Sequence, residues 1–197
     1  MKNLISTVML LTMITLLSAF TSNVTDGTFT VDSGASQVKW TGYHLAKSYE
    51  HNGFVKIKSG KFSVSDGKLT AGEFVIDMNT ISNSDVTDAK DNAKLVNHLK
   101  SDDFFGVKKF PEAKLLIKGS EPTASGLRVT ADLTIRGITK SILFDATLKE
   151  ADGGKVEATA TITVQRTDFE VMYGWKVSNA MLSGEFKMDV KLVGVKS

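Results

Sequence analysis

Three histidines, His44, His51 and His98, are the side chains of this 197-residue chain best suited to acid-base or metal chemistry near neutral pH. His44 and His51 lie seven residues apart, as they could on the two strands of one β-hairpin, but no pattern of carboxylates surrounds them. The chain contains no cysteine, which excludes thiol chemistry and thiolate metal ligands. We therefore predict no metal site.

Motifs that would indicate an enzyme are also missing from the sequence. There is no Gly-x-Ser-x-Gly nucleophile elbow, no glycine-rich phosphate-binding loop, no His-Glu-x-x-His pair and no paired-carboxylate signature. A catalytic triad assembles in space rather than along the chain, so these absences do not exclude an enzyme. No residue pattern favours one, however, and we predict a non-enzymatic protein without a cofactor.

The N-terminal residues are typical of a secretory signal peptide. Lys2 supplies a short positive region, residues 4–17 are mostly apolar, and small residues follow up to position 22. The apolar run is too short for a membrane span and no stop-transfer pattern follows it. We predict a signal peptide over residues 1–22 and one domain over residues 23–197, periplasmic or secreted and without a membrane span. A retained N-terminal anchor is the alternative.

The charge and the cysteine count limit the partners and the source of stability. The formal charge of the chain is +2, and residues 1–22 contribute Lys2 but no acid, so 2 − 1 leaves +1 on residues 23–197. A near-neutral balance argues against nucleic acid as a partner, because nucleic acid requires a concentrated basic face. Without disulfides, the domain must be stabilised by its hydrophobic core alone.

Strict alternation of apolar and polar residues dominates the chain after residue 28 and predicts half-buried β-strands. Glycine-containing turns such as Asp66-Gly67 and Asp152-Gly153-Gly154 separate the alternating runs, which predicts a mostly antiparallel meander. The alternation is clearest over residues 38–41, 55–58, 73–78, 114–118, 127–136, 142–148, 156–165 and 185–192.

About eight such strands, several of them ten residues long, are too many for one open sheet with a wet face. Closure into an all-β antiparallel barrel removes both edges, and a two-sheet sandwich is the alternative. A membrane-spanning barrel is disfavoured, because outward charges such as Lys56, Lys114 and Arg128 would each cost ~2–4 kcal/mol at the bilayer midplane. The alternation alone leaves open whether side chains fill the barrel or leave room for a ligand.

One segment between Asn79 and Pro111 has a different period. Apolar residues recur there at three- and four-residue steps up to Leu99, with Asp85 near the start and Lys100 near the end. This pattern predicts an amphipathic helix of about four turns. Two adjacent aromatic residues, Phe104 and Phe105, follow it in the sequence. An insertion of this length between barrel strands is usually functional, and we expect it to cap one open end.

Three motifs together resemble the YceI-like family. The most specific is His98-Leu99-Lys100-Ser101-Asp102-Asp103-Phe104-Phe105, followed by Phe-Pro-Glu-Ala at residues 110–113. The others are Asp-Leu-Thr-Ile-Arg-Gly-Ile-Thr-Lys at residues 132–140 and Val-Gln-Arg-Thr-Asp-Phe at residues 164–169. The chain departs from the family just before His98, where many relatives carry an Arg-Asp pair and this chain has Leu95 and Val96. Lys94 is close enough to take over a head-group role of that arginine.

The resemblance implies a lipocalin-like barrel that binds, carries or stores a long-chain isoprenoid-type lipid, polyprenyl or quinone-like, in its lumen. Its partner would be this isoprenoid or another amphiphilic lipid. Phe104 and Phe105 would form a lid, and His98 a polar contact near the mouth. The implied ligand-binding residues are Trp40, Phe62, Phe74, Ile76, Leu95, His98, Leu99, Phe104, Phe105, Leu133 and Phe144. The alternative is an envelope stress or adhesion-type module with a filled core that binds other proteins through its loops. A homodimer is left open by the sequence.

Overall fold

A computed structural model describes residues 24–44, 49–173 and 182–197, so the predicted signal peptide lies outside the described residues. Strands make up most of the described chain, and none of its helices is long and apolar enough to cross a membrane. The strands are β1 (Gly27–Val31), β2 (Gln37–His44), β3 (Glu50–Ser65), β4 (Lys68–Asp77), β5 (Glu112–Thr123), β6 (Gly126–Ile135), β7 (Ile138–Ala151), β8 (Lys155–Gln165) and β9 (Leu182–Lys196).

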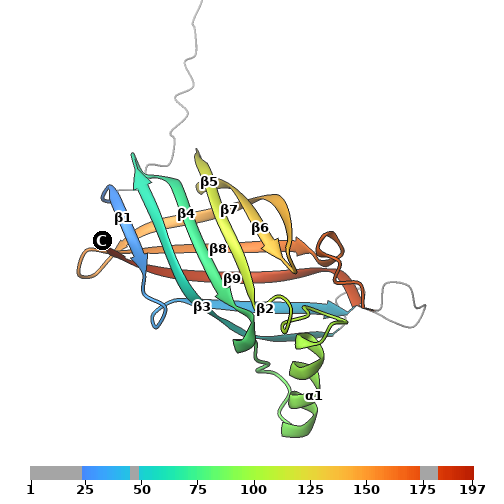
Figure 1. The fold of residues 1–197 in the computed structure, drawn as a ribbon. Coiled ribbons are helices and arrows are strands. Elements are labelled where there is room, and N and C mark those ends of the chain that lie inside the picture. Colours follow the sequence, from blue (N-terminus) through green and yellow to red (C-terminus); the bar gives the residue numbers. More distant parts are fainter. Residues whose placement is uncertain (1–23, 45–48, 174–181) are drawn as a thin grey trace, which may run out of the picture.

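The strands form a closed antiparallel barrel (Figure 1). The order β3-β2-β9-β8-β7-β6-β5-β4 returns to β3 through the β3–β4 pairing, which closes eight strands. Strand β1 runs in line with β2 between the same two neighbours: Phe29 pairs with Phe62 on β3, and Trp40 pairs with Gly53 further along β3. The predicted barrel is confirmed, and the sandwich alternative is wrong because each of the eight strands pairs with a neighbour on both sides.

The barrel interior is packed at one end and less tightly filled at the other. At the packed end, Phe29 stacks on Phe62 with ring centroids 5.3 Å apart, and both side chains are at most 2% exposed. Toward the other end, inward-facing residues such as Trp40, Phe186 and Met188 are only partly buried. The same alternating pattern therefore produces a solid floor at one end of the barrel and accessible apolar walls near the other.

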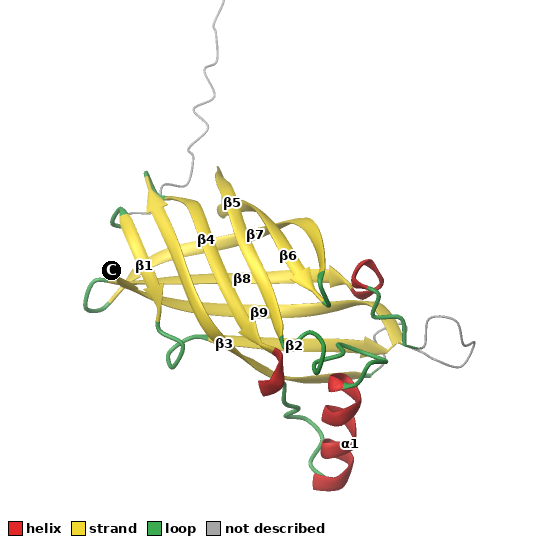
Figure 2. Cartoon of the chain, viewed as in Figure 1, coloured by secondary structure: helices red, strands yellow, loops and turns green. Residues whose placement is uncertain are grey.

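The long β4–β5 connection lies at the accessible end, which we call the mouth (Figure 2). This connection contains the 3-10 helix η2 (Met78–Thr80) and the helix α1 (Ala89–Lys100). The Asp88 side chain caps α1 by accepting hydrogen bonds from the main-chain nitrogens of Lys90 and Asp91. The helix is shorter than the four turns that the sequence predicts, because Asp85 lies outside it and binds strand β3 instead.

The segment before the helix, residues 81–86, is fastened to the inner face of β3. Ser82 N donates to Phe54 O and Ser84 N donates to Asn52 O, each at 2.9 Å. Gly53 makes this approach possible, because a Cβ atom at this position would lie only 1.8 Å from Ser82 O. The connection is therefore held across the mouth by main-chain contacts, as a cap whose position depends on one glycine.

Candidate functional site

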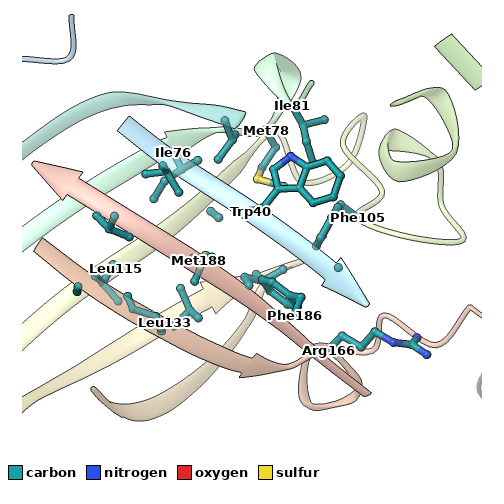
Figure 3. A pocket seen from close by; sticks show the side chains of 18 of the residues that line it. Trp40, Ile76, Met78, Ile81, Phe105, Leu115, Leu133, Arg166, Phe186 and Met188 are labelled. Carbon is teal, nitrogen blue, oxygen red and sulfur yellow. The ribbon is translucent and has the colours of Figure 1, made fainter. Parts of the chain in front are cut away.

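An apolar cavity of about 210 Å³ lies between the packed floor and the cap. Its walls come from strands β2 to β9, and its upper boundary from η2, α1 and the turn after α1. This volume exceeds that of an engineered apolar cavity of about 150 Å³ that stays dry and binds benzene. Residues that extend into the space from different strands and from η2 include Trp40, Ile76, Met78, Leu115, Leu133, Phe186 and Met188 (Figure 3).

Ten of the eleven residues that the sequence analysis selected border this one cavity. The floor includes Phe62 and Phe74, whose rings stack with centroids 6.4 Å apart. His98 is the exception, because it does not line the cavity. The ten that border it are Trp40, Phe62, Phe74, Ile76, Leu95, Leu99, Phe104, Phe105, Leu133 and Phe144.

The aromatic residues after α1 close the mouth together with residues from the β8–β9 side. The His98 ring meets Tyr173 edge-on at 4.3 Å and Phe104 at 5.2 Å, while Phe104 lies 5.6 Å from Tyr173. Phe105 points toward Phe186 of β9, with ring centroids 6.3 Å apart. We call His98, Phe104, Phe105 and Tyr173 the aromatic roof. His98 is thus part of the roof rather than of the cavity wall.

The turn that carries the roof is held by an arginine from the opposite hairpin. Arg136, in the β6–β7 turn, donates from Nη1 to the carbonyl oxygens of Asp102, at 2.9 Å, and of Phe104. Its guanidinium also lies over the Phe110 ring, 5.9 Å from the centroid. Two of the family motifs, residues 98–113 and 132–140, therefore meet at the mouth. Arg136 of the second motif holds the turn of the first.

Much of the β9 wall is absent from the binding residues predicted from the sequence. Phe186, Met188, Val190 and Leu192 all line the cavity. Their alternation with polar residues predicts the strand correctly, but it does not say which inward residues face free space and which face packed neighbours. That distinction depends on strand tilt and closure, which bring the β9 row opposite Trp40 of β2.

Polar groups from β3 and from the segment before α1 meet beside His51, which borders the cavity. The His51 Nδ1–H donates to Asp85 Oδ2 at 2.8 Å, and the Asn52 main-chain nitrogen donates to Asp85 Oδ1 at 2.7 Å. Burial raises the pKa of Asp85, but the hydrogen bonds from Asn52, His51 and Asn83 outweigh it and hold that pKa below its ordinary value. Among the described residues there is no group of three or more side chains placed to hold a metal ion.

A closed barrel with an apolar lumen below a capped mouth is the architecture of barrels that can hold one small ligand. Residues 29–194 match the YceI-like domain model, and the chain belongs to this family. A UPF0312 protein of Pseudomonas putida strain W619 is 32% identical over 165 residues, covering 81% of this chain and 80% of that protein. A UPF0312 protein of Shewanella denitrificans is 28% identical over 177 residues, covering 88% of this chain and 89% of that protein.

Solved structures share the fold at lower sequence identity. BcnA of Burkholderia cenocepacia superposes with a TM-score of 0.67 at 19% identity, covering 84% of this chain and 99% of that one. A polyisoprenoid-binding domain from Saccharophagus degradans gives a TM-score of 0.61 at 14% identity, covering 86% of this chain and 98% of that one. These likenesses establish the barrel and its connectivity.

Proposed function

We propose that this protein binds a long-chain isoprenoid-type lipid, polyprenyl or quinone-like, in the barrel lumen, and carries or stores it without catalysing a reaction. The observation that carries the proposal is the apolar cavity of about 210 Å³, bordered by strands β2 to β9. The fold shared with a domain described as polyisoprenoid-binding supports the same ligand class. We further propose that the protein is exported, on the strength of the sequence of residues 1–22.

Burial physics favours a hydrocarbon ligand here. A chain that loses on the order of 400 Å² of apolar surface gains about 10 kcal/mol at ~25 cal/mol per Å², before its own ordering cost. Met78 and Met188 both border the cavity, and their unbranched thioethers can adapt to ligands of different shape. Such a site needs few polar contacts, which agrees with the scarcity of polar motifs in the sequence.

The competing function, a protein-interaction module with a filled core, would leave no free space in the lumen. The cavity favours the lipid carrier over this alternative. The direct test is to purify the protein from its native host, extract it with organic solvent and identify the extract by mass spectrometry. We expect close to one isoprenoid molecule per protein. Extracts without any isoprenoid, quinone or fatty acyl species would refute the proposal.

A titration of the delipidated protein with an environment-sensitive lipid probe gives a second test. Met188→Gln places an amide in the apolar wall, and we expect it to weaken the probe affinity by roughly tenfold, since a buried amide without a partner costs about 1–3 kcal/mol. Leu143→Gln is the matched control, because Leu143 is 66% exposed on the outer wall of β7. Equal effects of the two substitutions would show that the probe binds elsewhere.

A further inference from the structure

Arg166 is a buried cation without an anionic partner. This residue is only 4% exposed and lies at the start of the short 3-10 helix η3 (Arg166–Phe169). Every Asp and Glu of the chain lies within the described residues, and none of them forms an ion pair with Arg166. Burial lowers the pKa of Arg166, and no neighbouring acid offsets this effect. The positive charge is therefore uncompensated.

Neutral main-chain oxygens use three of the five N–H groups of this guanidinium. Nε donates to Ser183 O at 2.7 Å, and Nη1 donates to Val171 O at 2.6 Å and to Tyr173 O at 2.9 Å. Nη2 is buried and has no hydrogen-bond partner among the residues that the structure describes. Holding Val171 and Tyr173 next to Ser183 explains the first three bonds. It leaves the charge and Nη2 unexplained, and an unpaired buried donor is costly.

The position of Arg166 connects it with the lumen and with the roof. Arg166 borders the cavity at the mouth, and its guanidinium extends beyond Phe186, away from the apolar wall (Figure 3). The carbonyl of Tyr173 accepts from Arg166, while the Tyr173 ring packs on His98 and Phe104 of the roof. A group that binds the guanidinium would thus lie where a chain in the lumen emerges, beside the contacts that close the mouth.

We propose that Arg166 is the docking site for an anionic oxygen head group, so that the lumen prefers an isoprenoid phosphate or carboxylate over the neutral lipid with the same chain. This inference rests on the proposed lipid binding and specifies its ligand class. Phosphate and carboxylate oxygens match the planar donor array of a guanidinium, and a charge-assisted bond is stronger than a neutral one. Such a ligand supplies both the missing partner of Nη2 and the missing counter-charge.

The test compares two ligands that differ only in the head group. Geranylgeranyl monophosphate and geranylgeraniol are titrated into the delipidated full-length mature protein at fixed ionic strength, with displacement of a lipid probe as the readout. We expect the phosphate to bind at least about tenfold more tightly, a ratio that corresponds to about 1.4 kcal/mol. Inorganic phosphate is titrated in parallel, and we expect it to compete with geranylgeranyl monophosphate but not with geranylgeraniol.

Three variants assign this preference to Arg166. Arg166→Gln should reduce the preference to about twofold or less while retaining geranylgeraniol binding, which also shows that the lumen is intact. Arg166→Lys should retain most of the preference, because it keeps the positive charge. It gives up the three main-chain bonds of the guanidinium, so it separates the role of the charge from the role of these bonds. Arg128→Gln is the control, since it removes the same charge from an exposed outer-wall residue paired with Asp145, and it should leave the preference unchanged.

Equal affinity for the two ligands in the wild type would overturn the head-group proposal and leave lipid binding intact. The same conclusion follows if Arg166→Gln keeps the full preference, or if Arg166→Lys loses as much of it as Arg166→Gln. Failure of both ligands to displace the probe would instead count against the proposed lipid binding itself.

Discussion

Gly53 offers the sharpest test of how the cap is attached. A Cβ atom at Gly53 would lie 1.8 Å from Ser82 O, 2.7 Å from Ser82 C and 2.9 Å from Asn83 Cα. All three neighbours are main-chain atoms, so no side-chain rotation can relieve the overlap. Gly53→Ala must therefore push residues 82–86 away from β3, and the cap should detach at this point while the barrel stays folded.

The expected cost follows from the bonds that this displacement breaks. Ser82 N to Phe54 O, Ser84 N to Asn52 O and the Trp40 indole nitrogen to Ser82 O are each 2.9 Å long and depend on the close approach. At about 0.5–1.5 kcal/mol for each bond, their loss destabilises the folded protein by roughly 2–4 kcal/mol. Faster amide hydrogen exchange should be confined to residues 82–100, and the unfolding midpoint in urea should fall.

Gly42→Ala is the matched control for this substitution. Gly42 lies on the neighbouring strand β2 and also borders the cavity, but a Cβ atom there meets nothing within 4 Å. We expect this variant to retain the exchange pattern of the wild type and to lose little or no stability. If Gly53→Ala exchanged and unfolded like Gly42→Ala, the close docking of the cap on β3 would be wrong.

Three further predictions concern the aromatic roof, the hydrogen bonds that Asp85 accepts from His51 and Asn52, and the floor of the cavity. Phe104→Ala combined with Phe105→Ala should lower probe affinity more than tenfold, while the delipidated protein loses less than the roughly 3–5 kcal/mol that each buried phenylalanine of a core would cost; probe titration and urea unfolding measure the two effects. Asp85 has a folded-state pKa below its ordinary value of 3.8, so its stabilising contribution is complete above that value and is lost as pH falls through the folded pKa. Urea midpoints of the wild type should therefore exceed those of Asp85→Asn near neutral pH and approach them in acid. A constant difference at all pH values would contradict a stabilising role for the charged Asp85 carboxylate. Phe62→Ala should deepen the floor, cost roughly 3–5 kcal/mol in unfolding free energy and shift binding toward longer isoprenoid chains in competition experiments; an unchanged chain-length preference would show that Phe62 does not limit the cavity.

The sequence by itself determined most of the strands and favoured their closure into a barrel, although it did not predict β1. Alternation is a local property with a period of two residues, so the run over residues 127–135 predicts the inward row of β6 without knowledge of its neighbours. The number and length of such runs then favour closure, because an open sheet would leave unpaired edges. The recognised motifs also indicated the cap and its two aromatic residues, Phe104 and Phe105, which the structure places at the mouth.

Only the tertiary structure decided which inward residues face free space and which polar groups meet. Val129 and Leu133 are both inward-facing residues in the alternating pattern of β6. Leu133 borders the cavity, whereas Val129 is fully buried and does not border it. Asp85, expected near the start of a helix, binds His51 and Asn52 across more than thirty residues of sequence. Arg166 looked like the end of a strand, and its unpaired charge is visible only once every acid of the chain has been placed. Periodicity reports the environment of one strand face, whereas cavities and buried charges depend on contacts between segments distant in the chain.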